Sequence, residues 1–150
     1  MVIRPARPDE AGRLTELALA SKAYWGYPED FLAACRAELT VTAERCASGS
    51  VRVAEENEVA GFAELAGVLP SLELTLLYVR PDRMGQGVGG LLLDDALSRA
   101  RACGATELRL DADPHAEGFY RHRGAVRIGD RPSGSIPGRR LPLLSFDLAG

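Results

Sequence analysis

VRPDRMGQGVGGLLL, residues 79–93, is the stretch that decides the fold. It ends a strand with a turn at Pro81 and opens a helix through four glycines among the six residues from Gly85 to Gly90. Glycines let the backbone approach a ligand closely, and the first amides of a helix lack internal partners and carry the positive end of its dipole. A diphosphate can therefore bind this helix start through backbone amides alone. The alternative is that the glycines serve a tight turn or close helix packing, which rarely needs four of them.

The residues after this loop have helical spacing from Gly87 to Cys103. One face is apolar, at Val88, Leu91, Leu92, Ala96, Leu97 and Ala100. The opposite face is polar, at Asp94, Asp95, Ser98 and Arg101. Such a pattern predicts a helix that packs one side on a core. Gly104 is placed to end it, since glycine favours the conformation that follows many helix C-termini.

Three strands are predicted before the glycine-rich loop. Val51–Glu55 alternates apolar and polar residues, and Glu56-Asn57 suits a tight turn into a second strand over Val59–Val68. The segment Leu69-Pro70-Ser71 separates this strand from a third over Leu72–Val79. Because short turns join antiparallel neighbours, the three strands are expected to be antiparallel.

The N-terminal third predicts one strand followed by helices. Val2–Arg4 reads as a short strand, and a helix begins at Pro8 with Asp9 as its N-cap. A second helix is predicted from Pro28 to Leu39, and Thr42 can cap a third short helical turn.

The chain after Gly104 returns to strands. We expect a strand over Glu107–Asp111, a helix over Ala116–Arg123, and two last strands over Ala125–Arg131 and Leu143–Asp147. The resulting order predicts an α/β (α+β) fold, with a mixed, mostly antiparallel central sheet flanked by helices.

Composition limits the class of protein. A chain of 150 residues, 46% of them hydrophobic, is sized for a single domain, residues 1–150. A formal net charge of -3 argues against nucleic acid as a partner. No segment approaches the roughly 18 apolar residues of a membrane span, so a cytoplasmic protein with no membrane partner is expected. The cysteines are expected to be reduced and buried: Cys35, Cys46 and Cys103.

The identity of the diphosphate is a separate question. Gly85, Gly87 and Gly90 satisfy G-x-G-x-x-G, and Asp111 ends the next strand, where a Rossmann unit has its ribose-binding acid. The context differs, because Arg80–Met84 separates strand from loop and antiparallel strands precede it. A P-loop is excluded, since no Gly-Lys-Ser/Thr occurs. Dinucleotide binding stays as an alternative.

Two segments resemble the motifs of the GCN5-related N-acetyltransferase (GNAT) family. Leu77–Asp82 followed by Gly85–Gly89 is similar to its acyl-CoA motif, a strand ending in aliphatic-Val-x-Pro and then Arg/Gln-x-x-Gly-x-Gly/Ala. Ala116–Gly124 is similar to its second motif, Asn-x-x-Ala-x-x-Phe-Tyr-x-x-x-Gly-Phe. The resemblance extends over essentially the whole chain, and the predicted element order is also the family's order.

The resemblance implies an acyl-CoA N-acyltransferase fold and acetyl-CoA as the acyl donor, without a metal. The residues that it assigns to the cofactor are Leu77, Tyr78, Val79, Met84, Gly85, Gln86, Gly87, Val88, Gly89, Gly90, His115, Ala116 and Phe119. Met84 stands where the family usually has arginine or glutamine, and Arg83 next to it could turn toward the phosphates. His115 lies near the family's asparagine, and Ala125 replaces the aromatic of Gly-Phe.

The resemblance also implies the reaction. In the family a substrate amine attacks the thioester carbonyl directly within a ternary complex, and a backbone amide at the strand end, here within Leu77–Val79, holds the carbonyl oxygen. The acceptor would be a primary amine of a small molecule or a peptide. Positioning and the amide donor would carry much of the rate.

Two side chains are catalytic candidates by the same resemblance. Glu73 matches the general-base glutamate of the histone-acetylating branch, and Tyr120 resembles the tyrosine that protonates the departing thiolate. A carboxyl pKa near 4.3 lies about six units below that of an amine near 10.4. Glu73 therefore needs burial, a relaying water or an amine of lower pKa. The alternatives are the polar face of a strand for Glu73 and a core aromatic beside Phe119 for Tyr120.

The acceptor site is assigned to two loops. Tyr24 and Trp25 lie between the first helices, where aromatics can hold an alkylammonium by cation-π attraction, although such a cluster can also be a small satellite core. Ser135 and Arg139 lie in the loop Arg131–Arg140, which is rich in turn formers and could cover the acceptor or be a solvated connection. A non-catalytic acyl-CoA sensor and a homodimer both stay open.

Overall fold

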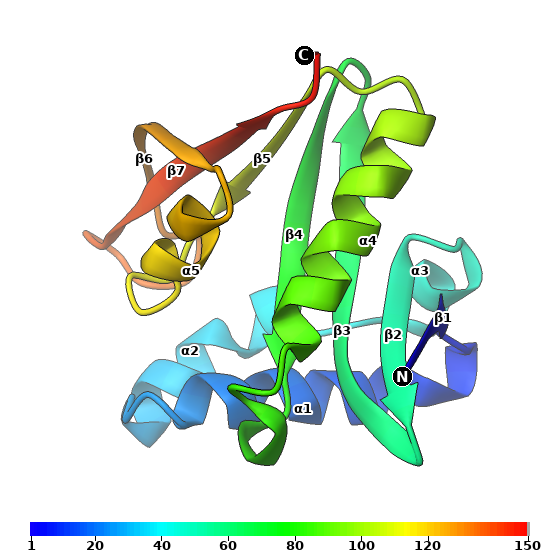
Figure 1. Cartoon of the computed structure of the whole chain (residues 1–150). Coiled ribbons are helices and arrows are strands. Elements are labelled where there is room, and N and C mark those ends of the chain that lie inside the picture. The colour runs from blue at the N-terminus through cyan, green and yellow to red at the C-terminus, as the bar shows by residue number, and fades with distance from the viewer. Residues whose placement is uncertain (150) are drawn as a thin grey trace.

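The computed structural model describes residues 1–149 and places seven strands in one sheet (Figure 1). The strands lie in the order β1-β2-β3-β4-β5-β7-β6, and within residues 1–149 β4 and β5 are the one parallel pair of neighbours. Their bounds are β1 Val2–Pro5, β2 Val51–Glu56, β3 Glu58–Val68, β4 Ser71–Val79, β5 Glu107–Asp111, β6 Val126–Pro132 and β7 Arg140–Asp147. The predicted mixed sheet is confirmed, and its topology differs from the parallel sheet of a Rossmann fold.

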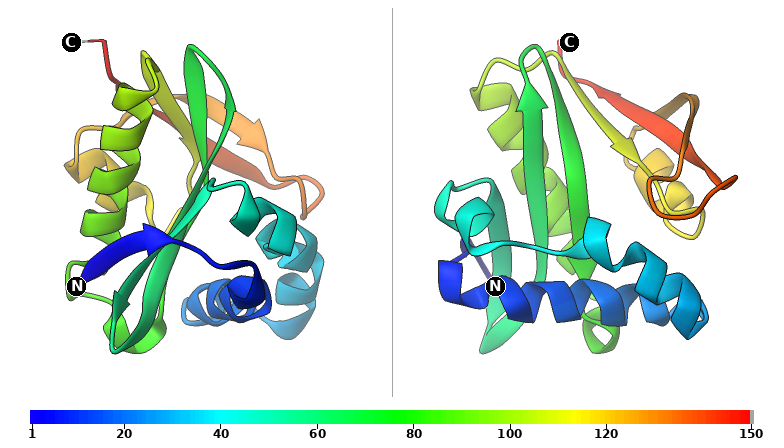
Figure 2. Two further views of the ribbon diagram at one scale, coloured as in Figure 1. Left: turned by 90° about the vertical axis from the view of Figure 1, so that its right-hand side faces the viewer. Right: turned by 180° about the vertical axis from the view of Figure 1, so that it is seen from behind.

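Helices cover both faces of the sheet (Figure 2). They are α1 Ala11–Ala23, α2 Glu29–Leu39, α3 Ala43–Ala47, α4 Val88–Ala102 and α5 Glu117–His122. The helices α4 and α5 share one face, and α1, α2 and α3 pack on the other. We call these the α4 face and the α1 face.

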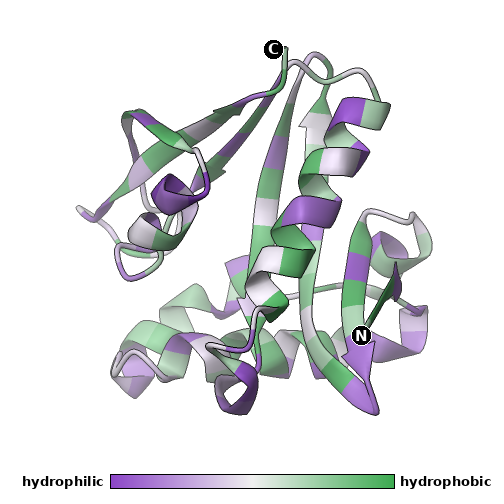
Figure 3. Cartoon of the chain, viewed as in Figure 1, coloured by the Kyte–Doolittle hydropathy of each residue, from purple (hydrophilic) through white to green (hydrophobic). Residues whose placement is uncertain are grey.

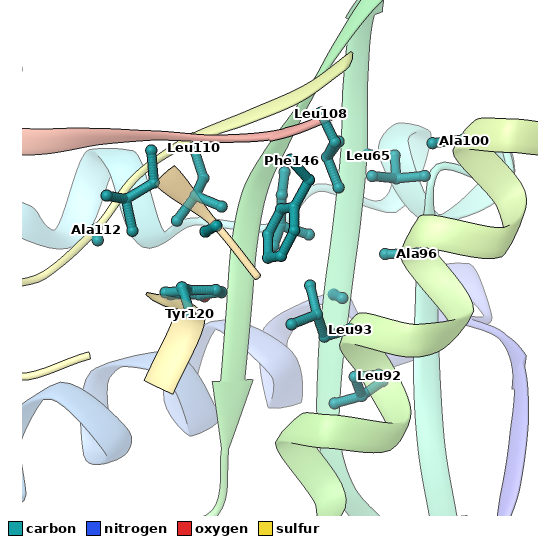
Figure 4. Packing of buried hydrophobic residues seen from close by; sticks show 14 of the residues in the cluster. Leu65, Leu92, Leu93, Ala96, Ala100, Leu108, Leu110, Ala112, Tyr120 and Phe146 are labelled. Atoms are coloured by element: carbon teal, nitrogen blue, oxygen red, sulfur yellow. The ribbon is translucent and has the colours of Figure 1, made fainter. Parts of the chain in front are cut away.

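Each face has its own hydrophobic core. On the α4 face, Leu92 and Leu93 of α4 pack with Leu108 of β5 and Phe146 of β7 (Figure 4). On the α1 face the core includes Leu14, Val53 and Phe62. Along α4, hydrophobic and hydrophilic residues alternate in bands, as a helix packed on one side requires (Figure 3). Burial of each large apolar side chain contributes about 1.5–3 kcal/mol.

A β-bulge on β4 ends the pairing between β4 and β5. Leu65 pairs with Leu74 and Glu64 pairs with Leu76, so Thr75 is an extra residue on β4. The Thr75 hydroxyl donates to the buried Glu64 carboxylate (2.5 Å), which also accepts two hydrogen bonds from Arg45 of α3. Bulges bend a strand and raise its twist.

The two parallel strands separate just beyond the bulge. Within the described residues, pairing of β4 with β5 covers Ser71–Glu73 and Glu107–Arg109. Figure 1 shows β5 running away from the lower part of β4 toward β7. The sheet is therefore open between the carboxyl ends of β4 and β5.

Gly61 on β3 allows α4 to lie close to the sheet. A Cβ atom at this position would be 2.7 Å from the Tyr78 carbonyl oxygen, and 3.1 and 3.2 Å from the side chains of Leu92 and Val88. Only a hydrogen fits there without a shift of the backbone. The contact fixes where α4 begins relative to β4.

Most predicted elements are confirmed within one to three residues, and Thr42 caps α3 by accepting from the Arg45 amide. Asp9 as an N-cap is wrong. Pro8–Glu10 forms a single 3-10 turn before α1, and the Glu10 carboxylate accepts from the Arg7 amide (2.8 Å). Arg4 pairs with the same carboxylate (2.8 Å), which compensates for its burial.

Three smaller expectations are corrected. Leu91 is 46% exposed, whereas Leu93 is buried, because the buried stripe of α4 is rotated relative to the predicted one. Cys103 is exposed at the end of α4, while Cys35 and Cys46 are buried as expected. The last strand begins at Arg140, so the preceding loop is shorter than predicted. In residues 1–149, no helix is long and apolar enough to cross a membrane.

We predict that Gly61→Ala destabilises the fold by about 1–3 kcal/mol, because the added methyl group must displace the Tyr78 carbonyl or α4. Gly12→Ala in α1 is the matched control, since a Cβ there meets no atom within 4 Å. Chemical denaturation of the two variants measures the difference. Equal unfolding midpoints would contradict the inferred close approach.

Candidate active site

A cavity of about 390 Å³ lies where β4 and β5 separate. Its walls come from β4, the glycine-rich loop, the first turn of α4, α5, the end of β5 and the end of α1. Because it has lining residues on both faces of the sheet, the cavity passes through the gap between the strands. Its volume lies in the range of small-molecule sites.

The α4 end of the cavity is a row of free backbone amides. In the described chain, no protein acceptor lies within hydrogen-bond geometry of the amides from Gly85 to Gly90, and the first helical bond runs from Leu91 to the Gly87 carbonyl (3.1 Å). Gly85 and Gly87 have φ angles of 78° and 86°. Backbone turns of this kind and the helix dipole both favour an anion.

β4 offers a second set of free backbone groups along the cavity. The Arg80 amide donates to the Ala60 carbonyl on β3 (2.8 Å). Because backbone groups alternate in direction along a strand, the amides of Leu77 and Val79 point away from β3, into the gap. An extended amide-bearing chain, or a carbonyl oxygen that gains negative charge, can accept hydrogen bonds there.

Tyr120 lies at the centre of the cavity wall. It is 6% exposed and extends from α5 near Leu110 and Ala112 (Figure 4). Within residues 1–149 its hydroxyl makes no hydrogen bond to a protein group, and burial is the one influence on its pKa. Burial raises the pKa of Tyr120 above its ordinary value of 10.0, so the hydroxyl stays protonated at neutral pH and can donate.

Nearly all residues predicted to bind the cofactor line this one cavity. They are Leu77, Tyr78, Val79, Met84, Gly85, Gly87, Val88, Gly89, Gly90, His115, Ala116 and Phe119. The Gln86 side chain turns back and accepts from Arg83 (2.8 Å). Arg83 also lines the cavity, and its guanidinium contacts Glu56 (3.2 Å).

Arg123 is a cavity residue that sequence reasoning missed. Its guanidinium lies over Gly90, where a Cβ atom would be 2.2 Å from one of its nitrogens. It also stacks on Phe119 (5.3 Å) and pairs with Asp94 (3.5 Å). A cation thus spans from α5 to the start of α4. Its place inside the second motif, directly before Gly124, was the available signal.

Glu73 lies on the α1 face, outside the cavity lining. Its carboxylate accepts from Arg131 of β6 (3.1 Å), and the same guanidinium is 2.9 Å from Asp111. Asp111 lines the cavity, whereas the sequence pattern indicated it only as the ribose-binding acid of a Rossmann unit. The base role of Glu73 therefore stays a prediction.

A polar cluster closes the α1 end of the cavity. Asp113 contacts Lys22 (3.1 Å), the Tyr27 hydroxyl (3.0 Å) and the backbone amide of His115 (2.9 Å). Burial alone would raise the pKa of Asp113, but the His115 amide and Lys22 outweigh it and hold the pKa below its ordinary value. The cluster joins α1, the α1–α2 turn and the turn before α5.

The four residues predicted for the acceptor have different surroundings. Trp25 lines the cavity and stacks on His115 (4.9 Å), whereas Tyr24 is exposed beside it. Arg139 donates to the Tyr27 hydroxyl (2.9 Å) and joins the polar cluster. Ser135 lies outside the cavity lining, in a turn where its amide donates to Ser133.

The described residues, 1 to 149, hold no group of three or more His, Cys, Asp or Glu side chains that could bind a metal ion. What the cavity offers is backbone amides, a protonated phenol and paired charges.

Solved structures have this fold. A GCN5-related N-acetyltransferase from Rhodopseudomonas palustris superposes with a TM-score of 0.78 at 27% identity, covering 98% of this chain and 95% of that one. The PaiA N-acetyltransferase of Thermoplasma acidophilum, solved with coenzyme A, has a TM-score of 0.77 at 21% identity, covering 97% and 98%. The fold is that of the N-acetyltransferase class.

Sequence comparison identifies the family. Residues 27–133 match the model of the acetyltransferase (GNAT) domain. The peptidyl-lysine N-acetyltransferase YjaB of Salmonella typhimurium is 32% identical over 96 residues, which are 64% of this chain and 61% of that protein. The match thus spans less than two thirds of the relative's length. The chain belongs to the GNAT acetyltransferase family.

We predict that Gly87→Ala weakens binding of acetyl-CoA by roughly tenfold or more, because an alanine at a φ of 86° is strained and reorients the amides beside it. Gly104→Ala is the matched control, since Gly104 has a φ of 91° at the other end of α4. Calorimetry with acetyl-CoA and NADH side by side measures both. Equal acetyl-CoA affinities would contradict the site, and binding of NADH alone would favour the dinucleotide alternative.

Proposed function

We propose that this protein transfers the acetyl group of acetyl-CoA to a primary amine by direct attack in a ternary complex. The observation that carries the proposal is a cavity that passes through the sheet, with free amides at its α4 end and charged side chains at its α1 end. The donor and the acceptor can thus reach a common point from opposite faces. This arrangement suits direct transfer between two bound substrates.

The α4 end fits the donor. The amides from Gly85 to Gly90 suit a pyrophosphate, and Arg123 adds a cation above Gly90. The free backbone edge at Leu77 and Val79 suits the amide-bearing arm that leads to the thioester. A related protein of the same fold was solved with coenzyme A, which supports this choice of donor.

The chemistry between the two ends needs an oxyanion donor and an acid. A backbone amide of Leu77 or Val79 would stabilise the carbonyl oxygen as the amine attacks it. Tyr120 would give its proton to the departing thiolate. Burial raises the pKa of Tyr120 above its ordinary value of 10.0, further from that of a thiol near 8.5, so Tyr120 would act on the departing thiolate first as a hydrogen-bond donor.

The acceptor is proposed as a primary amine of a small molecule or a peptide. The Salmonella relative is named for transfer to peptidyl lysine, which supports an aliphatic amine. Trp25 is the predicted acceptor residue that lines the cavity. Free cysteines are typical of a reducing compartment, so we place the activity in the cytoplasm.

We predict that the wild-type protein releases the thiol of coenzyme A with at least one amine in a panel of polyamines, amino acids and lysine peptides. Tyr120→Phe is expected to lower kcat by about ten- to a hundredfold, because the variant keeps the ring but loses the proton donor. Thiol detection measures both rates.

The affinity for acetyl-CoA distinguishes a loss of catalysis from a loss of folding in the Tyr120→Phe variant. Tyr120→Phe should bind acetyl-CoA as tightly as the wild-type protein by calorimetry, since the hydroxyl acts on the leaving group. Tight binding of acetyl-CoA with no thiol release from any amine would instead favour the sensor alternative.

A further inference from the structure

The cavity reaches the α1 face beside Asp111. Leu110 and Ala112 belong to the core of the α4 face, so Asp111 between them points to the other side of the sheet, because side chains alternate along a strand. Asp111 is a cavity-lining residue, as is Tyr120, whose hydroxyl has no hydrogen-bond partner among residues 1–149. A carboxylate and a phenol therefore border the same space from different elements.

Asp111 and Glu73 share one guanidinium but are held differently. Arg131 donates an aligned hydrogen bond to Glu73 (3.1 Å). Its Nε lies 2.9 Å from an Asp111 oxygen, yet this nitrogen makes no hydrogen bond of acceptable geometry within the described chain. Both carboxylates thus pair with Arg131, and Asp111 is the one of the two that borders the cavity.

The surroundings of Asp111 favour uptake of a proton. The charged groups that face it are Arg131 from β6, Glu73 from β4 and Glu38 from α2. Burial raises the pKa of Asp111, the two glutamates act in the same direction, and together they outweigh Arg131. An ammonium group that enters the same partly buried space loses water, which lowers its own pKa. The two shifts reduce the difference between the pKa of the ammonium and the pKa of Asp111.

We propose that Asp111 is the general base of the acetyl transfer, accepting the proton of an alkylammonium acceptor that enters from the α1 face. The assignment rests on the proposed function and replaces Glu73 in that role. An Asp111 oxygen takes the proton of the ammonium, which leaves a neutral amine. The nitrogen lone pair then forms the new C–N bond as the C–S bond breaks.

Every proton of the reaction has a destination. The attacking nitrogen becomes positive as its bond forms, and it loses a second proton when the amide is complete. Tyr120 gives its proton to the thiolate, and the proton lost by the nitrogen restores the tyrosine. The products are the acetamide, the free thiol and one proton, held by Asp111 until it passes to solvent.

The proposal defines the substrate class as amines that are protonated at neutral pH. An acceptor whose nitrogen is already neutral would not need Asp111. This difference separates a base from a residue that only supports the fold, because a structural defect lowers the rate of both kinds of acceptor.

The test uses two matched acceptors and the full-length protein. One is a lysine peptide, and the other is the same peptide with an aminooxy group in place of the ε-amine, which is unprotonated at pH 7. For a small-molecule acceptor, spermidine and an aminooxy compound of similar length form the pair. Asp111→Asn is compared with Asp130→Asn, a control that removes the carboxylate of an exposed ion pair with Arg140 on the edge strand β6.

The expected result is selective. Asp111→Asn should lower kcat/KM for the amine by about a hundredfold at pH 7, and the rate should recover as the pH rises toward the pKa of the amine. The aminooxy acceptor should lose less than about fivefold with the same variant, on the basis that no proton has to be removed first. Asp111→Glu should restore part of the amine activity, and Asp130→Asn should behave as wild type with both acceptors.

Other results would overturn the proposal. Equal losses for both acceptors in Asp111→Asn would make Asp111 a structural residue. The selective loss in Glu73→Gln, with Asp111→Asn unchanged, would return the base to Glu73. A wild-type protein that acetylates neither member of any pair would overturn the proposed function itself, whereas an active wild type with an unaffected Asp111→Asn would overturn only the base.

Discussion

The whole site depends on a β-bulge, in which β4 has one more residue than the stretch of β3 that it pairs with. Thr75 has no partner on β3, and its hydroxyl is fixed on the buried carboxylate of Glu64, which Arg45 neutralises from α3. The strand bends at this point, and β5 no longer follows it. Separation of two parallel strands would normally leave unpaired backbone groups at a cost in free energy. Here those groups line a cavity, where a ligand can pair them.

The two ends of the cavity are built from different material. At the start of α4, recognition groups belong to the main chain from Gly85 to Gly90, and Arg123 is the nearby cation. At the α1 face, recognition groups are side chains, including Asp111, Asp113 and Trp25. The α4 end suits the acyl donor, which is the same in every turnover. The α1 end suits the acceptor, whose chemistry can differ between family members.

Periodicity in the sequence predicted the elements well, because each one shows its own repeat of apolar residues. The anion-binding role of the glycine-rich loop could also be predicted, because a helix start and its glycines depend only on residues that are neighbours in the sequence. The bulge at Thr75 could not be predicted, because it is a shift in the pairing of β3 with β4, and the sequence of one strand alone does not show it. The choice between Glu73 and Asp111 depends on where β4 and β5 separate. The pairing of Tyr27 with Asp113 joins segments 86 residues apart, beyond the reach of any local pattern.

The row of main-chain donors has a consequence for how this protein can change over time. A side chain that binds a ligand disappears with a single codon change, but an amide from Gly85 to Gly90 is present whatever residue stands there, proline excepted. Substitution in this loop is limited by backbone shape at Gly85 and Gly87, and by the Arg123 guanidinium that lies over Gly90. The acceptor end has no such protection. New acceptors can therefore be acquired by a few substitutions near Trp25 and Asp111, while the use of the donor is inherited unchanged.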